Sequence, residues 1–316
     1  MKTLTITECA EHLKNADKIL ILMHRSPDGD AVGSGYALAY ALRSIGKFAQ
    51  PVCSDDIPKK YSYITNNLEV QDFEPEYIVT VDLADTQLFG DKLIQYKDKV
   101  DLCIDHHPSN TDYAKYGIID GNAGACAQIV KKVISAMDIP IDKNIANAVF
   151  TAISTDTGCF KYSNADAEAY QMAAEMVACG ADSFFINRLM FDTKSRSRLE
   201  LERLALNSLK YYNDEQIAVI FITKEMLEKS GADDNDTEGI SGIPRQIEGV
   251  KIGITIREKG ENNFRISVRS AGDIDVSAIC TQFGGGGHKA AAGCTIITDT
   301  LSDAERQITN AAGAVL

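Results

Sequence analysis

The segment from Ile19 to Gly35 reads ILILMHRSPDGDAVGSG, and it indicates how the chain folds at this point. Its first four residues are apolar, which is typical of a buried strand. His24, Asp28 and Asp30 then follow within seven residues, beside a proline and a glycine, and such residues end a strand. The Ala-rich continuation to Gly46 is typical of a helix. A strand that leads through a polar turn into a helix is the first half of a βαβ unit.

The rest of the chain extends this alternation and then changes character. Apolar β-rich runs recur up to about residue 120, as QPVCS, YIVTVD, DLCID and YGIID, which predicts a doubly wound, mainly parallel sheet. A second strand-rich region starts with QIAVIFIT and includes VKIGITIRE, NFRISVRS and GCTIIT. We therefore expect an α/β protein with a first domain over 1–192, a linker helix over 193–213 and a smaller α/β domain over 214–316.

Composition and charge restrict the class of function. Hydrophobic residues make up 45% of the 316 residues and charged residues 24%, as in ordinary soluble globular proteins. The formal charge of -13 argues against a broad basic face that would grip long nucleic acid through its phosphates. Small anionic ligands remain compatible with it if metal ions or local basic loops compensate.

Cysteine usage and the N-terminus indicate the compartment. The eight cysteines form no CxxC pair, and several lie in apolar runs, so buried reduced thiols are favoured over a disulfide framework or a zinc site. The polar start MKTLTITECAEHLKNADK is unlike a signal peptide, and no apolar stretch approaches the ~18 residues that span a bilayer. We expect a cytoplasmic protein without membrane contact.

Polar side chains close three of the expected strands. In open parallel sheets the ligand crevice lies beyond the carboxyl ends of the strands, so these positions are the first candidates for function. Taken alone, each has a simpler explanation, such as a turn cap or an Asx-turn. However, three of only five histidines fall at strand ends beside aspartates. The candidates are His24, Asp28, Asp30, Asp82, Asp105, His106 and His107, with Asp156 at the end of a helix-like run.

Such a set of residues requires cations. Carboxylates that converge on one crevice repel one another unless positive charge is present. Oxygen ligands mixed with imidazole suit Mn²⁺ or Mg²⁺ better than structural zinc, which favours thiolates. With at least four aspartates available, two metals that share a bridging carboxylate, ~3.5–4 Å apart, are the simplest arrangement, and such pairs perform phosphoryl chemistry.

Four motifs resemble those of a known family. HRSPDGDA, VDLAD, DHHP and TDTG occur in the order of the motifs of the DHH phosphoesterase superfamily. The segment GGGGHKAAAG, from Gly284 to Gly293, resembles the glycine-rich signature of the DHHA1 domain. The arrangement is most similar to the NrnA-type members, which are bifunctional oligoribonucleases and 3'-phosphoadenosine 5'-phosphate (pAp) phosphatases. The resemblance implies a catalytic DHH domain, a substrate-binding DHHA1 domain and an active site in the cleft between them.

The same resemblance implies roles for individual residues. It assigns one metal to His24, Asp28 and Asp82, and the other to Asp30, Asp82, His106 and Asp156, with Asp82 as the bridge. The implied cofactors are two Mn²⁺, for which Mg²⁺ or Co²⁺ can substitute. His107 would act with Asp82 in catalysis by facing the substrate phosphate, and Asp105 would orient a histidine. For holding the nucleotide, the resemblance implies Arg269, Ser270, Gly286, Gly287 and His288, where glycine amides can also cradle an anion.

The expected function is hydrolysis of short oligoribonucleotides, about two to five nucleotides long, and dephosphorylation of pAp to AMP, because a closed grip and an acidic surface do not suit long strands. Three alternatives remain open: a phosphodiesterase for cyclic dinucleotides or pApA, a manganese inorganic pyrophosphatase, and a non-catalytic nucleotide sensor. The sequence does not distinguish a monomer from a homodimer.

Overall fold

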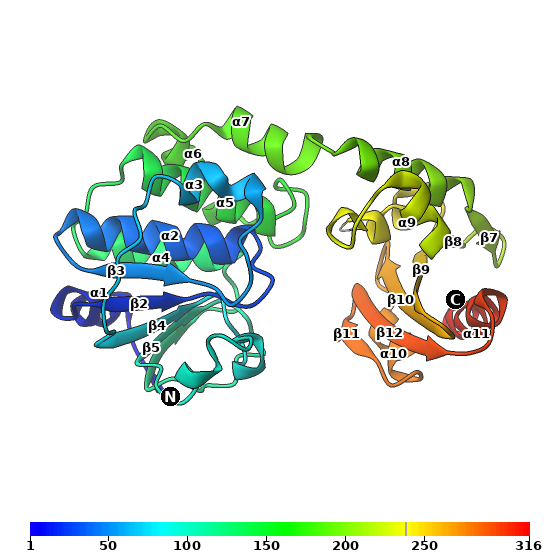
Figure 1. Ribbon diagram of the computed structural model, residues 1–316, viewed down its shortest axis with the longest axis horizontal. Coiled ribbons are helices and arrows are strands. Elements are labelled where there is room, and N and C mark those ends of the chain that lie inside the picture. The colour runs from blue at the N-terminus through cyan, green and yellow to red at the C-terminus, as the bar shows by residue number, and fades with distance from the viewer. Residues whose placement is uncertain (238) are drawn as a thin grey trace. The chain divides into compact units, whose positions relative to one another are not determined.

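The computed structural model describes residues 1–237 and 239–316. The chain divides into two compact units, residues 1–193 and 194–316, and each has a six-stranded sheet and an apolar core of its own (Figure 1). The expected α/β architecture with a mainly parallel first sheet is confirmed. Within the described ranges, no helix combines the length and the apolar content needed to cross a bilayer.

The first sheet is parallel throughout, in the order β1-β6-β5-β4-β2-β3. β1 lies outside the apolar runs of the sequence, and both of its residues are exposed. The other five strands match those runs, and four or five residues are enough to cross a core of this size. Their bounds are β1 (Lys2–Thr3), β2 (Ile19–Leu22), β3 (Ala49–Val52), β4 (Tyr77–Val81), β5 (Leu102–Asp105) and β6 (Tyr116–Ile119).

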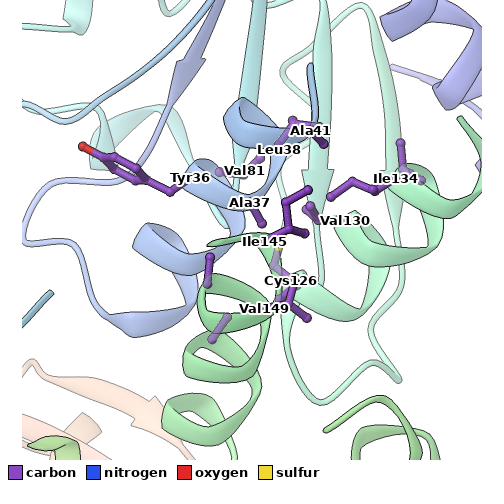
Figure 2. Close-up of a cluster of buried hydrophobic side chains, with 14 of the residues drawn as sticks. Tyr36, Ala37, Leu38, Ala41, Val81, Cys126, Val130, Ile134, Ile145 and Val149 are labelled. Carbon is purple, nitrogen blue, oxygen red and sulfur yellow. The ribbon is translucent and has the colours of Figure 1, made fainter. Parts of the chain in front are cut away.

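Long helices cover one face of this sheet. α2 (Gly29–Ser44) and α4 (Cys126–Ala136) lie against the strands, and α5 (Lys143–Asp156) packs on both of them. Figure 2 shows apolar side chains of α2, β4, α4 and α5 meeting in this core. The remaining helical segments are α1 (Ile6–Asn15), α3 (Ser62–Thr65), α6 (Ala167–Ala178), α7 (Ser183–Asn187) and a π-helical turn over Arg188–Asp192.

Short turns cover the opposite face. Side chains alternate along β2, so Ile19 and Ile21 face the long helices while Leu20 and Leu22 join a second cluster around Phe89. That cluster is closed by the 3₁₀ turns Thr86–Leu88 and Ile94–Tyr96. A third such turn, Lys59–Tyr61, precedes α3.

The strand order reverses at a defined place in the first sheet. The chain moves from β2 to β3 in one direction and from β4 through β5 to β6 in the other. Since crossovers between parallel strands are right-handed, the connections on the two sides of this reversal go to opposite faces of the sheet. They therefore separate at the carboxyl ends of β2 and β4, where open α/β sheets bind their ligands.

The sheet of the second unit is mixed, in the order β11-β12-β10-β9-β8-β7. Strands β8 and β9 run parallel, and the other neighbours are antiparallel. The strands are β7 (Lys210–Tyr212), β8 (Ile217–Ile222), β9 (Ile252–Gly260), β10 (Asn263–Ser270), β11 (Gly286–His288) and β12 (Ala291–Ile297).

Helices pack on both faces of the second sheet. α10 (Val276–Thr281) and α11 (Leu301–Gly313) bury one face with residues such as Ile279 and Ile308. α8 (Arg196–Asn207) packs on the other face at β8, and α9 (Lys224–Ser230) lies beside it. The 3₁₀ turns of this unit are Asn235–Thr237, Ile240–Gly242 and Pro244–Gln246.

The cysteines agree in part with the expectation of buried reduced thiols, because Cys53, Cys159 and Cys179 are only partly buried. All eight are free. Buried side chains behave as small apolar groups in the two cores, and these are Cys9, Cys103, Cys126, Cys280 and Cys294.

Candidate metal centre

Acidic and imidazole side chains meet at the carboxyl ends of β2, β4 and β5. They form three overlapping groups in which the candidate ligand atoms lie within 4.8 Å of one another. Asp82 belongs to two of these groups and His106 to two, so the groups make one continuous cluster. The groups are His24, Asp28 and Asp82; Asp30, His106 and Asp156; and Asp82, His106 and His107.

Asp82 lies at the centre of the cluster. It directly follows β4, is 3% exposed, and has a left-handed backbone with a φ of 54°. Its Oδ1 is buried and has no hydrogen-bond partner among the described residues, and it lies 3.5 Å from Nε2 of His106. Its Oδ2 lies 3.7 Å from Nε2 of His24. A buried carboxylate oxygen without a donor is costly, and a cation would satisfy it.

His24 and Asp28 are fixed by the start of α2. Asp28 is the N-cap of this helix, and its Oδ1 accepts from the backbone amides of Asp30 and Ala31 at 3.1 Å. His24 donates from Nδ1 to the carbonyl of Arg25 at 2.7 Å. This bond leaves Nε2, which faces Asp28 at 3.7 Å, as the nitrogen available for a metal.

Asp30 receives donors from the start of α4. The amides of Cys126 and Ala127 donate to its two carboxylate oxygens at 2.6 and 3.1 Å, and Ser34 adds a hydroxyl at 2.9 Å. These contacts orient a carboxylate that is only 1% exposed. His106 donates from Nδ1 to the carbonyl of Ala123 at 3.0 Å, so its Nε2 faces the cluster.

Two glycines bring Asp156 to Asp30. Asp156 ends α5, and α2 approaches this helix closely because Gly29 lies against Thr155 and Gly33 against Ala152. A Cβ at Gly33 would lie 2.4 Å from the carbonyl oxygen of Ala148. Oδ2 of Asp156 and Oδ2 of Asp30 each lie 3.7 Å from Nε2 of His106.

The carboxylates of the cluster are buried close together, which favours the binding of positive charge among them. Burial, then the carboxylates of Asp30 and Asp28, raise the pKa of Asp82 well above its usual range. Burial, followed by the charge of Asp30, raises the pKa of Asp156 to about 7. Since divalent cations stabilise neighbouring carboxylates in their ionised form, the oxygen and imidazole donors present here fit such ions.

His107 differs from His106 in its partner. Its Nδ1 donates to Oδ1 of Asp105 at 2.7 Å, and this hydrogen bond raises the pKa of His107. Asp105 is completely buried, and its Oδ2 accepts from Asn110 at 2.7 Å. His107 therefore presents Nε2 outward while Nδ1 is held by Asp105.

Sequence reasoning missed two asparagines. Asn110 holds Asp105, and Asn164 donates to the carbonyl of Gly124 at 2.9 Å and to the backbone and side chain of Asp156 at 3.2 and 3.5 Å. Asn110 comes three residues after His107, so the sequence alone could have placed it near the DHH motif. The partners of Asn164 become visible only after folding.

The nucleotide-binding candidates of the second unit lie at the end of its sheet. Ala291 of β12 lies opposite Arg269 of β10 on one side and opposite His288 of β11 on the other. Residues directly opposite one another in neighbouring strands point to the same face of a sheet, so Arg269 and His288 share one face. Gly287 has a φ of 146°, and a Cβ there would lie 2.6 Å from the carbonyl oxygen of Ala291. Ser270 follows Arg269 and points to the opposite face, where it is 3% exposed and donates to the carbonyl of Gly272 at 2.9 Å. At Gly286, an added Cβ would meet no atom of the described residues within 4 Å.

Comparison with known proteins identifies the class. Residues 18–153 match the N-terminal domain of the DHH family, and residues 214–314 match the DHHA1 domain. The chain belongs to the DHH family and carries a DHHA1 domain.

Individual relatives cover almost the whole chain. The bifunctional oligoribonuclease and PAP phosphatase NrnA of Thermus thermophilus is 30% identical over 96% of this chain and 91% of its own. The protein of the same name from Bacillus subtilis is 23% identical over 92% of this chain and 93% of its own. The crystal structure of an exopolyphosphatase-related protein from Bacteroides fragilis has a TM-score of 0.87 and 28% identity, and covers 97% of this chain and 94% of its own.

Proposed function

We propose that this protein is a two-metal phosphoesterase that hydrolyses short oligoribonucleotides to 5'-mononucleotides and dephosphorylates pAp to AMP. The activities are those of an exoribonuclease and a 3'(2'),5'-bisphosphate nucleotidase. The relatives named for both activities span more than nine-tenths of this chain, which supports transfer of the reaction as well as the fold. We propose a cytoplasmic location and Mn²⁺ as the metal.

The observation that carries the proposal is the position of Asp82. Its two oxygens face different imidazoles, His24 on one side and His106 on the other, and no donor from the part of the chain that the structure describes reaches Oδ1. This is the arrangement expected of a carboxylate that bridges two cations. His24 and Asp28 would complete one site, and Asp30, His106 and Asp156 the other.

The roles of the protein groups follow from their contacts. Two bound divalent cations would supply positive charge that activates water and stabilises the phosphoryl group. Asp105 holds Nδ1 of His107, so the outward Nε2 is the atom that would donate to a phosphoryl oxygen as negative charge develops. Amides of α4 and α2 keep the carboxylates of Asp30 and Asp28 in fixed orientations, so less reorganisation is needed during the reaction.

Both proposed activities break the same type of bond. Release of a 5'-mononucleotide from RNA cleaves a P–O3' bond, and removal of the 3'-phosphate of pAp cleaves a P–O3' bond as well. One metal centre can therefore serve both reactions if other residues bind the part of the nucleotide that does not react. Arg269 and His288, which share one face of the second sheet, are the proposed grip, together with the backbone of Gly286 and Gly287.

A panel of substrates tests the proposal. Purified protein with Mn²⁺, Mg²⁺ or Co²⁺ receives pAp, an RNA trimer, an RNA 24-mer, pApA, cyclic di-AMP and pyrophosphate in parallel. We expect turnover of pAp and the trimer and little of the 24-mer. Preference for cyclic di-AMP or pApA, or for pyrophosphate, would assign the protein to one of those activities instead, and binding without turnover would indicate a sensor.

A variant tests the bridge separately. Asp82→Ala removes the shared ligand, so we expect both ions to be lost or one to be held weakly, and hydrolysis to stop. Metal content is measured by mass spectrometry, and far-UV circular dichroism is recorded on the same sample to check that the variant is folded. Two tightly bound ions in a folded Asp82→Ala protein would contradict the bridging role.

A further inference from the structure

The turn that follows α5 has an unusual backbone. Three successive residues, Gly158, Cys159 and Phe160, have φ values of 58°, 58° and 61°. Left-handed conformations disfavour residues with a Cβ, and they cluster at functional sites where the surroundings fix them. Here the amide of Cys159 donates to the carbonyl of Ser154 at 2.7 Å, and that of Tyr162 to the carbonyl of Thr157 at 3.1 Å.

This turn supports the ring of Tyr162. A Cβ at Gly158 would lie 2.4 Å from Cζ and Cε2 of the tyrosine, so the outer half of the ring rests directly against the glycine backbone. Tyr162 is nevertheless 52% exposed. A side chain that is buttressed by the main chain but half open to solvent is preorganised for contact with a ligand.

Asp156 ties this segment to the metal centre. Gly158 comes two residues after Asp156, and Asn164, two residues after Tyr162, donates to the backbone and the carboxylate of Asp156. The chain on both sides of Tyr162 is therefore held next to Asp156. The carboxylate of Asp156 lies 3.7 Å from Nε2 of His106.

We infer that Tyr162 is a stacking platform for the nucleobase of the nucleotide whose phosphate is bound at the metal centre. The inference rests on the proposed function and adds a specificity-determining residue to it. Aromatic rings stack on any base, because every base has a π-face, so this contact distinguishes a nucleotide from a simple phosphate ester without reading the sequence. An enzyme that degrades short RNA of any sequence needs this kind of tolerance.

Removal of the ring tests the inference. Tyr162→Ala is assayed on pAp and on its abasic analogue, and titrated calorimetrically with AMP and with ribose 5-phosphate. We expect kcat/KM for pAp and affinity for AMP to fall by about 5- to 150-fold, and both base-free ligands to change by less than about twofold. Tyr162→Phe keeps the ring and should retain nearly full activity.

Tyr170 provides a matched control. It is 53% exposed, packs on Phe160 with ring centroids 5.1 Å apart and donates to its carbonyl at 3.0 Å, so Tyr170→Ala disturbs the same turn without removing the platform. Equal losses on pAp and on the abasic analogue, or equal effects of Tyr162→Ala and Tyr170→Ala, would overturn the inference. The wild type could fail to hydrolyse pAp and yet bind AMP more tightly than ribose 5-phosphate. If Tyr162→Ala then abolishes this preference, the stacking role stands and the proposed reaction is wrong.

Discussion

Asn110 donates a hydrogen bond of 2.7 Å to Oδ2 of Asp105, whose other oxygen accepts from Nδ1 of His107 at the same distance. The asparagine is therefore linked through a buried carboxylate to the imidazole proposed to face the substrate phosphate. Asn110 also donates its backbone amide to the carbonyl of His107 at 3.1 Å, which closes the loop between them. The orientation of His107 thus depends on a residue that does not touch it through its side chain.

Asn110→Ala should lower kcat about tenfold with little change in KM or metal content, because a lost hydrogen bond to a charged group is worth ~1.5–3 kcal/mol and only part of it acts on His107. The double variant with His107→Ala tests the coupling. If Asn110 acts through His107, the second substitution should add almost nothing to the loss. Independent losses that multiply would mean that Asn110 supports the loop in general.

The stability of the metal-free protein should depend on Asp156. Its pKa is raised from 3.8 to about 7 in the folded state, so the folded protein holds a proton that the unfolded chain has released. Between those pH values the free energy of unfolding should fall as pH rises. We expect Asp156→Asn to reduce this slope in urea titrations made with a chelator.

Manganese should change that behaviour, because a bound cation replaces the proton and its affinity rises with pH. Excess Mn²⁺ should flatten the pH dependence of the wild type between about pH 4 and 7. Identical slopes for the wild type and Asp156→Asn in the presence of the chelator would show that the folded protein does not raise the pKa of Asp156.

Gly33→Ala should damage the fold and the site together. The added methyl group would meet the Ala148 carbonyl and the Ala152 side chain, which forces α2 and α5 apart. We expect a loss of about 1–3 kcal/mol in the free energy of unfolding. Since Asp30 and Asp156 lie on these two helices, the Mn²⁺ affinity should fall as well.

Gly242→Ala is a suitable control, because no atom of the residues that the structure describes lies within 4 Å of the position that its Cβ would occupy. It should leave Mn²⁺ affinity unchanged. If Gly33→Ala lowers stability but binds Mn²⁺ as the wild type does, the spacing of the two helices does not set the metal centre.

Arg269→Ala and His288→Ala should separate substrate binding from chemistry. Charge-assisted hydrogen bonds to a phosphate are worth ~1.5–3 kcal/mol, so turnover of pAp and short RNA should fall by about ten- to a hundredfold for each variant. Bis-p-nitrophenyl phosphate presents no nucleotide and should be hydrolysed nearly as well as by the wild type. Arg203→Ala, which removes a surface arginine paired with Glu200, is the control. Equal losses of activity on pAp and on bis-p-nitrophenyl phosphate would contradict the assignment of nucleotide binding to the second unit.

Local signals explain most of what the sequence predicted. Strands such as Tyr77–Val81 are short apolar runs, and their ends are marked by a change to aspartate and histidine. A parallel sheet collects the carboxyl ends of its strands at one edge, so residues distant in sequence can be grouped from the strand pattern alone. Alternation along a strand adds a constraint on the second unit: Arg269 and Ser270 are neighbours in β10, so only one of them can face a ligand on a given side.

The sequence by itself therefore determined the class of the fold and the residues that meet at the edge of the first sheet, because both follow from hydrophobic periodicity and from the order of the motifs. Only the tertiary structure decided what holds those residues in place. Asn110 donates a hydrogen bond to Asp105, Ala152 packs against Gly33, and the ring of Tyr162 packs against Gly158. Such contacts depend on side-chain packing in three dimensions, which has no periodic signature along the chain.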